Sequence, residues 1–290
     1  MKKVVILGAT GMIGSAIYGV LKNKHSLVVG MRNSRDSKLI NDVYGGVTNH
    51  KVVEFDANLI YQEYVKRNGG GEYCQSFINQ IKDADYVINA AGIVPSFVLD
   101  NESLTFFLNS AFPHLLAREF GEKLIHITTD CVFDGAVGSY NENSPKNPVD
   151  LYGLSKSLGE PSGCLVLRTS TIGRELKNFK GLIEWLLQQE DKEISGFANQ
   201  FWNGITSKEL GRVCDKIISS PDKFPKTGLY HIFSTKLSKY EMLLKFKDKY
   251  NINCVVNSIG EPRIDRSLST IHNFNKTLSI PPFDEMLADL

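Results

Sequence analysis

The sequence predicts an α/β fold in which a doubly wound parallel sheet is followed by a smaller mixed α/β domain. Two observations lead to this expectation. Short β-branched runs alternate with longer amphipathic stretches through the first half, a pattern typical of a parallel sheet covered by helices. A glycine-rich turn, Gly-Ala-Thr-Gly-Met-Ile-Gly at residues 8–14, also joins the first apolar run to the first helical pattern. Together they indicate a sheet of the Rossmann type.

The strands expected in this sheet are near-continuous apolar runs, as strands buried on both faces require. They lie at residues 4–7, 27–29, 52–55, 86–89, 124–128 and 165–167. Helical patterns lie between them at 11–21, around 75–81, at 104–120 and at 152–159. Residues 68–72 include three consecutive glycines and are expected to form a surface loop.

Beyond residue 168 the regular alternation weakens. Helical patterns appear at 182–189, 207–218 and 239–250, with an isolated strand at 229–233 and a connector at 219–225. The predicted division is therefore a doubly wound domain at 1–168 and a second domain formed mainly by 169–290. Some segments of the second part are expected to return and pack on the first.

Composition excludes several classes of protein. The 33 Lys and Arg against 32 Asp and Glu give a net charge of +1, without the basic surface of a general nucleic-acid binder. The five cysteines form no CxxC pair and the six histidines show no metal-ligand spacing, so neither disulfides nor a metal is expected. No run approaches the ~20 apolar residues of a membrane span. We expect a cytoplasmic protein with no membrane partner.

The glycine turn suits a pyrophosphate. One glycine permits a tight turn, one lets the backbone approach the phosphates, and one lets the helix pack on the sheet. The anion then lies at a helix N-terminus, where free N–H groups and the helix dipole favour negative charge. A glycine-rich turn without a ligand is the alternative, which the strand–turn–helix context disfavours.

The end of the second strand decides between two cofactors. Arg32 and Arg35 follow this strand, with Lys38 close behind, and the first acid is Asp36. A carboxylate at the strand end would bind a ribose 2′-hydroxyl, whereas an arginine accommodates a 2′-phosphate. The arginines therefore favour NADP(H) over NAD(H). Solvated surface cations are the alternative interpretation.

Tyr152 and Lys156 are spaced to lie on one face of a helix. An ammonium beside a phenol stabilises the phenolate and lowers the tyrosine pKa, which suits acid–base chemistry. Chance alone produces such spacings, and Tyr18 with Lys22 repeats it in the first helix, where packing is the expected role. The later pair follows the strand at 124–128 with its hydroxyl-rich end, and ligands of such sheets bind beyond the carboxyl ends of the strands.

Four segments occur in the order found in a known family. They are the glycine turn, Asn-Ala-Ala-Gly at 89–92, Thr-Thr-Asp-Cys-Val-Phe-Asp-Gly at 128–135 and Tyr-Gly-Leu-Ser-Lys at 152–156, with weaker echoes at 168–170 and 266–268. On these segments the chain resembles an extended short-chain dehydrogenase/reductase, specifically the dTDP-4-dehydrorhamnose reductase family of sugar-nucleotide reductases. The match covers the first 170 residues densely and the rest sparsely.

The resemblance implies a role for each matching residue. Thr129 would hydrogen-bond the substrate oxygen, Tyr152 would donate the proton, and Lys156 would hold the nicotinamide ribose while acidifying the tyrosine. Together with the turn and the arginines, it predicts a cofactor site made of Gly8, Thr10, Gly11, Met12, Ile13, Gly14, Arg32, Arg35, Asp56, Ala57, Asn89, Ala90, Ala91, Gly92, Thr128, Tyr152, Lys156, Thr169 and Ser170. The predicted substrate contacts are Thr129, Asp130, Val132, Trp202 and Arg266. For Trp202 a packing loop, and for Arg266 a surface arginine, are the alternatives.

The chain departs from the family pattern at two positions. Cys131 stands where many members have tyrosine, and Pro161 shortens the helix that carries Lys156. No histidine lies at motif spacing from Cys131, so we expect a packed small side chain rather than a reactive thiol.

These observations lead to the hypothesis of an NADPH-dependent reductase of a 4-keto nucleotide sugar, of the kind used in polysaccharide biosynthesis. Residues 1–168 then form a NAD(P)-binding domain and 169–290 mainly a substrate-binding domain. One alternative is a nucleotide-sugar epimerase or dehydratase with tightly bound NAD, and another is a non-catalytic NADP-binding regulatory subunit. The sequence leaves open the sugar, the base and the stereochemistry, and it allows a homodimer.

Overall fold

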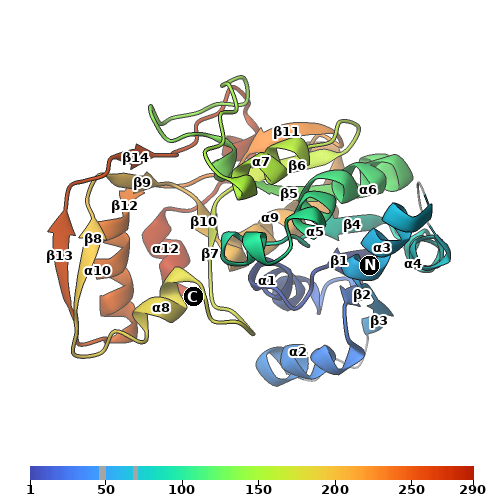
Figure 1. Ribbon diagram of the computed structural model, residues 1–290, viewed down its shortest axis with the longest axis horizontal. Helices are drawn as coiled ribbons and strands as arrows, with labels where there is room; N and C mark the ends of the chain where they lie inside the picture. Colours follow the sequence, from blue (N-terminus) through green and yellow to red (C-terminus); the bar gives the residue numbers. More distant parts are fainter. Residues whose placement is uncertain (46–49, 68–70) are drawn as a thin grey trace.

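The computed structural model describes residues 1–45, 50–67 and 71–290, with a seven-stranded sheet at its centre (Figure 1). The strand order is β11-β6-β5-β4-β1-β2-β3, and every pairing is parallel. The strands are β1 (Lys3–Leu7), β2 (Ser26–Met31), β3 (His50–Glu54), β4 (Tyr86–Asn89), β5 (Leu124–Thr129), β6 (Leu165–Thr169) and β11 (Gly228–His231). The predicted doubly wound fold is confirmed. The order reverses between β1 and β4, where such a sheet opens a crevice for a ligand.

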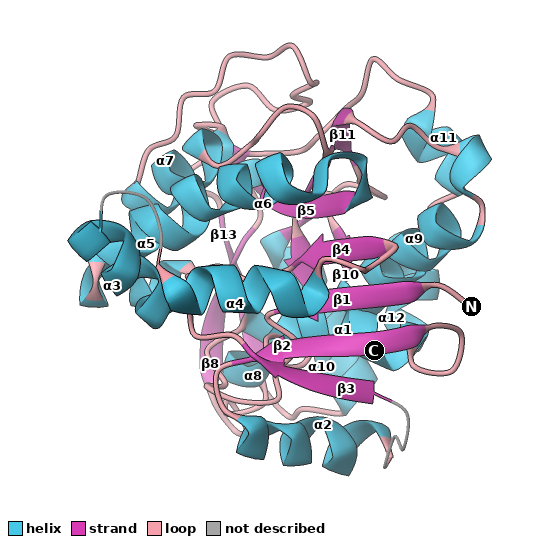
Figure 2. Cartoon of the chain, turned by 90° about the vertical axis from the view of Figure 1, so that its right-hand side faces the viewer, coloured by secondary structure: helices cyan, strands magenta, loops and turns pink. Residues whose placement is uncertain are grey.

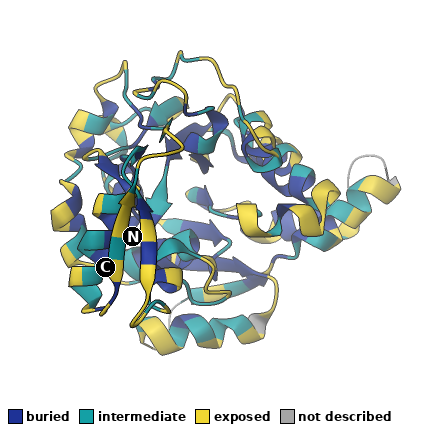
Figure 3. Cartoon of the chain, turned by 60° about the vertical axis from the view of Figure 1, so that its left-hand side comes forward, coloured by how far each residue is buried: buried dark blue, intermediate teal, exposed yellow. Residues whose placement is uncertain are grey.

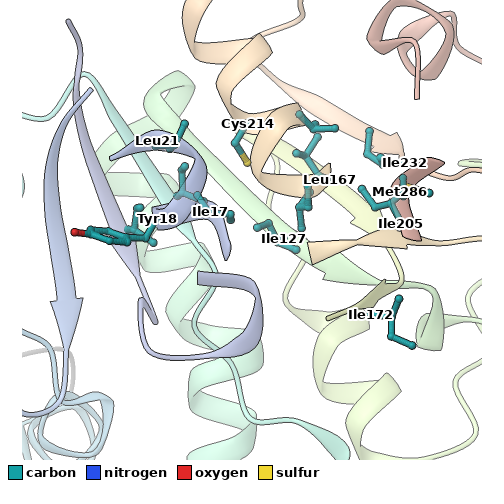
Figure 4. Packing of buried hydrophobic residues seen from close by; sticks show 14 of the residues in the cluster. Ile17, Tyr18, Leu21, Ile127, Leu167, Ile172, Ile205, Cys214, Ile232 and Met286 are labelled. Carbon is teal, nitrogen blue, oxygen red and sulfur yellow. The ribbon is translucent and has the colours of Figure 1, made fainter. Parts of the chain in front are cut away.

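One face of the sheet is covered by α1 (Met12–Leu21) and α9 (Ser207–Ser219), which pack against each other. Val4 and Ile6 of β1 belong to the core on this side. Figure 4 shows side chains of this core from both helices and the sheet, among them Ile17, Leu21, Ile127, Leu167 and Cys214.

The opposite face is covered by α4 (Glu72–Ile81) and α6 (Phe112–Phe120). Val5 and Leu7, the alternate residues of β1, belong to this second core. Figure 2 shows both helices in front of the strands, and Figure 3 shows the strands as largely buried. Because both faces are covered, the strands are continuous apolar runs, and all six strands predicted for the first domain are present.

Two helices of the first half were not predicted, α2 (Ser37–Tyr44) and α3 (Ala57–Arg67). Only Ile40 is buried in α2. The predicted loop at 68–72 is wrong at its last residue, because α4 begins at Glu72. Residues 68–70 of that loop lie outside the described residues.

The single helix predicted over 104–120 is wrong, because a π-helical turn divides it. The segment consists of α5 (Glu102–Phe106), the π-helical turn Phe107–Ala111 and α6. Pro113 explains the interruption. It has no N–H to bond the carbonyl oxygen of Asn109, four residues earlier, so a regular α-helix cannot continue through it.

Helix α7 (Leu151–Leu158) carries the predicted tyrosine and lysine, within one residue of the predicted bounds. Asp150 caps it, accepting a hydrogen bond from the Gly153 backbone N at 2.7 Å. A Cβ on Gly153 would lie 2.2 Å from the carbonyl oxygen of Cys131, so the glycine lets α7 lie against the segment that follows β5. This contact sets Tyr152 beside the end of β5.

The second half forms three further small sheets and four further helices within the described residues (Figure 1). The sheets pair β7 (Thr171–Ile172) with β10 (Ile205–Thr206), β9 (Gln200–Trp202) with β12 (Leu237–Ser238) and β14 (Ile264–Asp265), and β8 (Glu193–Phe197) with β13 (Val255–Ile259). The helices are α8 (Leu182–Leu186), α10 (Lys239–Tyr250), α11 (Phe274–Leu278) and α12 (Phe283–Ala288). The predicted helices at 182–189, 207–218 and 239–250 are α8, α9 and α10.

The strand predicted as isolated at 229–233 is instead β11, the edge strand of the main sheet. It pairs with β6, with Leu229 opposite Val166. The other strands of the second half were missed because they contain two to five residues and give little periodic signal. The division of the chain at residue 168 stays a prediction.

Candidate active site

The glycine turn after β1 leaves room for phosphates. Gly8 has a φ of +77°, in the left-handed region that favours glycine, and a Cβ on it would lie 2.9 Å from the backbone N of Ala91. A Cβ on Gly14 would lie 2.2 Å from the carbonyl oxygen of Gly8, so this glycine lets α1 approach β1. Gly11 is the N-cap of α1 and supplies no side-chain cap, which leaves the first N–H groups for an anion.

A cavity of about 270 Å³ opens beside this turn. It lies beyond the carboxyl ends of β4, β5 and β6, next to the switch point of the sheet. The predicted site residues that line it are Met12, Ile13, Ala90, Ala91, Gly92, Thr128, Thr129, Asp130, Tyr152, Lys156, Thr169 and Ser170. The folded chain therefore brings together residues that are up to 158 positions apart (Met12 to Ser170).

Thr128 is an independent sign that a polar ligand belongs here. Its hydroxyl Oγ1 is buried and has no hydrogen-bond partner among the described residues, and the residue is 3% exposed. A buried hydroxyl without a partner is unfavourable by about 1–3 kcal/mol, which a ligand amide or hydroxyl would relieve. With the glycine turn, this arrangement fits a nicotinamide dinucleotide.

Tyr152, in the first turn of α7, lines the cavity together with Thr129, the last residue of β5. Burial raises the pKa of Tyr152 above its ordinary value, and the Thr129 hydroxyl opposes this only in part. The expected lowering of the tyrosine pKa by Lys156 is therefore wrong for this structure. The phenol stays protonated at neutral pH, which is the form of a proton donor.

The ammonium of Lys156 is directed at the sheet. Its Nζ donates to the carbonyl oxygen of Ile127 in β5 at 3.0 Å, and the residue is 6% exposed. Burial lowers the pKa of Lys156 to about 8, against the opposing influence of the Glu160 charge. Tyr152 and Lys156 line the same cavity.

Asn109, in the π-helical turn, was not singled out from the sequence. Its Oδ1 accepts from the backbone N of Ile93 at 2.9 Å, and its Nδ2 donates to the Ile93 carbonyl at 2.9 Å and to Ser155 Oγ at 3.0 Å. A Cβ on Gly159 would lie 1.8 Å from the Asn109 carbonyl oxygen, so the end of α7 lies directly on this turn. Pro113, which interrupts the predicted helix, was the signal that could have drawn attention here.

Asp130 is buried between polar neighbours at the cavity. The Thr129 hydroxyl donates to its Oδ1 at 3.2 Å, and burial raises the pKa of the Asp130 carboxyl against the opposing charge of Arg266. The Cys131 thiol contacts the same oxygen at 3.7 Å, and burial raises the pKa of this thiol to about 12. Cys131 is therefore a thiol at neutral pH, as expected of a packed rather than reactive side chain.

A buried ion pair fixes the chain just after α7. Arg168 of β6 donates to both carboxylate oxygens of Glu160, at 2.9 and 2.6 Å. Its Nη1 lies 2.8 Å from Nε2 of His231 in β11, and the other ring nitrogen lies 2.7 Å from the Ser269 carbonyl. Burial, then the Arg168 charge, lower the pKa of His231 to about 4, so the ring is neutral and accepts from Arg168. The end of α7 is thus held to two strands.

A second cavity of about 240 Å³ adjoins the first, and the two share Met12 and Thr171. Trp202, predicted from the sequence, lines it. So does Lys239, which no sequence pattern indicated. The Lys239 ammonium donates to Gln200 Oε1 at 2.8 Å, and burial lowers its pKa. An aromatic ring and a cation in one cavity suit an anionic nucleotide.

Some predicted site residues lie outside both cavities. Val132 is fully buried with Phe133, Tyr140 and Leu268, so the structure does not bring its side chain to the substrate cavity. Arg266 is half-buried and donates to the carbonyl of Phe133 at 3.0 Å, close enough for its charge to act on Asp130.

The remaining predicted cofactor residues are not among those that line the two cavities. Arg32 and Arg35 are exposed after β2, and Asp56 accepts from the Asn58 backbone N at 2.8 Å at the start of α3, where the buried Ala57 lies. Asn89 is buried behind the cavity, with its Nδ2 3.1 Å from His126 Nδ1. In the described ranges no group of three His, Cys, Asp or Glu could hold a metal ion. No helix there is long and apolar enough to cross a membrane.

A doubly wound sheet with a glycine turn at its switch point and a Tyr/Lys pair at the adjoining cavity defines a dinucleotide-binding protein of the short-chain dehydrogenase/reductase type. The chain belongs to the family described as RmlD substrate binding domain, whose model matches residues 1–262. The family predicted from the sequence is thereby confirmed. The chain is homologous to dTDP-4-dehydrorhamnose reductases, which are NAD(P)-dependent oxidoreductases.

Individual relatives are distant. Methionine adenosyltransferase 2 subunit beta of Xenopus tropicalis is 26% identical over 266 residues, covering 87% of this chain and 73% of that protein. The spore coat polysaccharide biosynthesis protein SpsK of Bacillus subtilis (strain 168) is 24% identical over 274 residues, covering 89% and 83%. The crystal structure of dTDP-4-dehydrorhamnose reductase from Bacillus anthracis str. Ames in complex with NADP has a TM-score of 0.71 and 20% identity, covering 99% and 98%. That structural likeness shows the fold.

Proposed function

We propose that this protein is an NADPH-dependent reductase of a 4-keto nucleotide sugar. The observation that carries the proposal is the meeting of Thr129, Tyr152 and Lys156 at one cavity, beside a turn built for phosphates. These residues supply a proton donor, a hydroxyl that holds the reacting oxygen and a cation. Membership of the family supports the class of substrate.

A bound dihydronicotinamide supplies the hydride for the keto carbon. Tyr152, which burial keeps protonated, donates its phenolic proton to the oxygen as that oxygen gains negative charge. The hydroxyl of Thr129, which lines the same cavity, holds the same oxygen in place. Lys156, an ammonium below pH of about 8, binds a ribose hydroxyl of the cofactor.

The choice of NADP(H) rests on the turn after β2. Arg32 and Arg35 are exposed there and free to meet a 2′-phosphate, which an arginine binds through two parallel hydrogen bonds. Thr169 and Ser170, at the cavity wall, bind the amide of the nicotinamide.

The second cavity receives the nucleotide part of the substrate. Trp202 offers a surface for stacking a base, and Lys239 offers a positive charge for the diphosphate. Because the two cavities adjoin at Met12 and Thr171, one extended ligand can reach from Lys239 to Tyr152.

A substrate screen tests this proposal. The full chain is mixed with NADPH and a panel of dTDP-, UDP- and GDP-linked 4-keto sugars, and NADPH absorbance is followed. The matched control is the same panel with the 4-keto group already reduced. We expect NADPH consumption with a keto sugar and none with its reduced partner. If the chain binds NADPH but consumes it with none of the keto sugars in the panel, the proposal is contradicted.

A second candidate is a nucleotide-binding subunit without turnover, supported by the similarity to methionine adenosyltransferase 2 subunit beta. The complete set of Thr129, Tyr152 and Lys156 favours the reductase, because a subunit without turnover needs no proton donor. An epimerase or dehydratase would regenerate its cofactor, so NADPH consumed in proportion to product separates it from the reductase.

A further inference from the structure

Residues 173–181, the 173–181 loop, connect β7 to α8 and contact two parts of the ligand-binding region. Gly173, Glu175 and Gly181 of this loop line the second cavity. From there the loop runs toward α1 and α2 before it returns to α8 (Figure 1). It is thus the one segment in the described residues that both lines this cavity and makes an ion pair with the turn after β2.

Several contacts fix the loop. Glu175 Oε2 accepts from the backbone N of Lys180 at 2.9 Å, which closes the loop on itself. Arg174 donates to Glu184 of α8 at 2.7 Å, and Leu176 packs against the hydrophobic core. Because these contacts hold both ends of the loop, its tip has a defined position.

The tip of the loop contacts the turn after β2. The Nζ of Lys177 lies 3.1 Å from Oδ2 of Asp36, although 141 residues separate the two in sequence. Asn178 and Phe179, with φ of +73° and +51°, turn the chain back immediately afterwards. Asp36 directly follows Arg35 in the turn at which the adenosine ribose of a dinucleotide is expected.

The charge of Asp36 matters for the choice of cofactor. It is the first carboxylate after β2, and a free carboxylate in this turn accepts from a ribose 2′-hydroxyl and repels a 2′-phosphate. Paired with Lys177, its charge is balanced, and Arg32 and Arg35 then dominate the turn. The two side chains are 39% and 27% exposed, and a pair this exposed adds little to stability, so its main consequence is electrostatic.

We propose that Lys177 is a specificity residue for the cofactor: by pairing with Asp36 it cancels a negative charge beside the 2′-phosphate and directs the turn to NADP(H). The inference rests on the proposed function, since it concerns the same cofactor site. It assigns part of the cofactor selection to a residue of the second half of the chain.

Binding measurements test this inference without turnover. The dissociation constants of NADPH and NADH are measured by calorimetry for the full chain, for Lys177→Met and for Lys180→Met. Lys180 is the matched control, because it is an exposed lysine of the same loop. We expect Lys177→Met to weaken NADPH binding about tenfold, as one unbalanced charge near a phosphate dianion would. NADH binding in this variant, and both cofactors with Lys180→Met, should change less than about twofold.

The Lys177→Met substitution in an Asp36→Asn background completes the test. With Asp36 neutral, Lys177→Met leaves no unbalanced charge, so the double variant should bind NADPH within about twofold of the wild-type chain. A tenfold loss that persists there, an equal loss for both cofactors, or no loss in Lys177→Met overturns the inference alone. A wild-type chain that binds NADH as tightly as NADPH overturns both the inference and the proposed cofactor preference, and it does so before any variant is made.

Discussion

The chain contains two tyrosine–lysine pairs with identical spacing, and of the two only Tyr152 with Lys156 lines the cavity beside the glycine turn. In α1, the Tyr18 hydroxyl lies 3.0 Å from His50 Nδ1, and Lys22 donates to the carbonyl of Tyr44. In α7, Tyr152 and Lys156 both line the cavity beyond the carboxyl ends of the strands. The difference teaches that position relative to the sheet, rather than spacing along a helix, makes such a pair available for chemistry.

The pKa values of the tyrosines do not distinguish the pairs. Burial raises the pKa of Tyr18 to about 12, and burial also raises the pKa of Tyr152. What separates them is the surroundings of each side chain: an imidazole that packs against Tyr18, or a cavity that Tyr152 lines together with Thr129.

Removing each tyrosine hydroxyl should give the largest difference between the two pairs. Tyr152→Phe should lower turnover about 10³-fold, because the proton donor is lost, while NADPH binding stays near wild type. Tyr18→Phe should leave turnover within about twofold and lower the free energy of unfolding by about 1 kcal/mol, through the lost hydrogen bond to His50. Steady-state kinetics and urea denaturation measure the two effects. Equal activities in the two variants would refute the account.

Replacing the two lysines should change the free energy of unfolding in opposite directions. The pKa of Lys156 is lowered from 10.5 to about 8, so the buried ammonium is unfavourable by about 3 kcal/mol at neutral pH. Lys156→Met should therefore raise the free energy of unfolding by about 2 kcal/mol at pH ~7, after loss of the bond to Ile127, while turnover falls about 10²-fold. Lys22→Met should lower stability by about 0.5–1 kcal/mol and leave turnover unchanged.

The lowered pKa of Lys156 also determines how the free energy of unfolding changes with pH. Below pH of about 8 the lysine is protonated in both folded and unfolded chains, and the full penalty applies. Between about 8 and 10.5 the folded chain loses its proton first, so wild-type stability rises with pH. The advantage of Lys156→Met should therefore shrink over this range. A Lys156→Met chain less stable than wild type at pH ~7 would show that the ammonium is not disfavoured by burial.

The rate of reduction should report the same titration. Since the pKa of Lys156 is about 8, kcat/KM should be level below this pH and fall about tenfold per unit above it, as the ammonium is lost. The Tyr152 phenol, with its raised pKa, stays protonated throughout this range. If kcat/KM changes by less than about twofold between pH 7 and 10, the charge of Lys156 has no role in the reaction.

The sequence predicted those parts of the molecule that local patterns encode. The six strands are apolar runs because both faces of the sheet are buried, and the glycine turn is visible because Gly8 and Gly14 have no room for a side chain. It did not predict the direction of the Lys156 ammonium, because the contact with Ile127 depends on how α7 lies against β5. Lys239 has no motif around it, since the folded chain alone brings it to the cavity.

The reductase assignment itself is tested most directly by following the hydride. With NADPH deuterated at the reactive position of the nicotinamide and the 4-keto nucleotide sugar found by the screen, the account predicts deuterium at carbon 4 of the product sugar. One NADPH should be consumed for each product formed, and the Tyr152→Phe chain should form product about 10³-fold more slowly. Product that forms without net consumption of NADPH, or without deuterium at that carbon, would contradict the account.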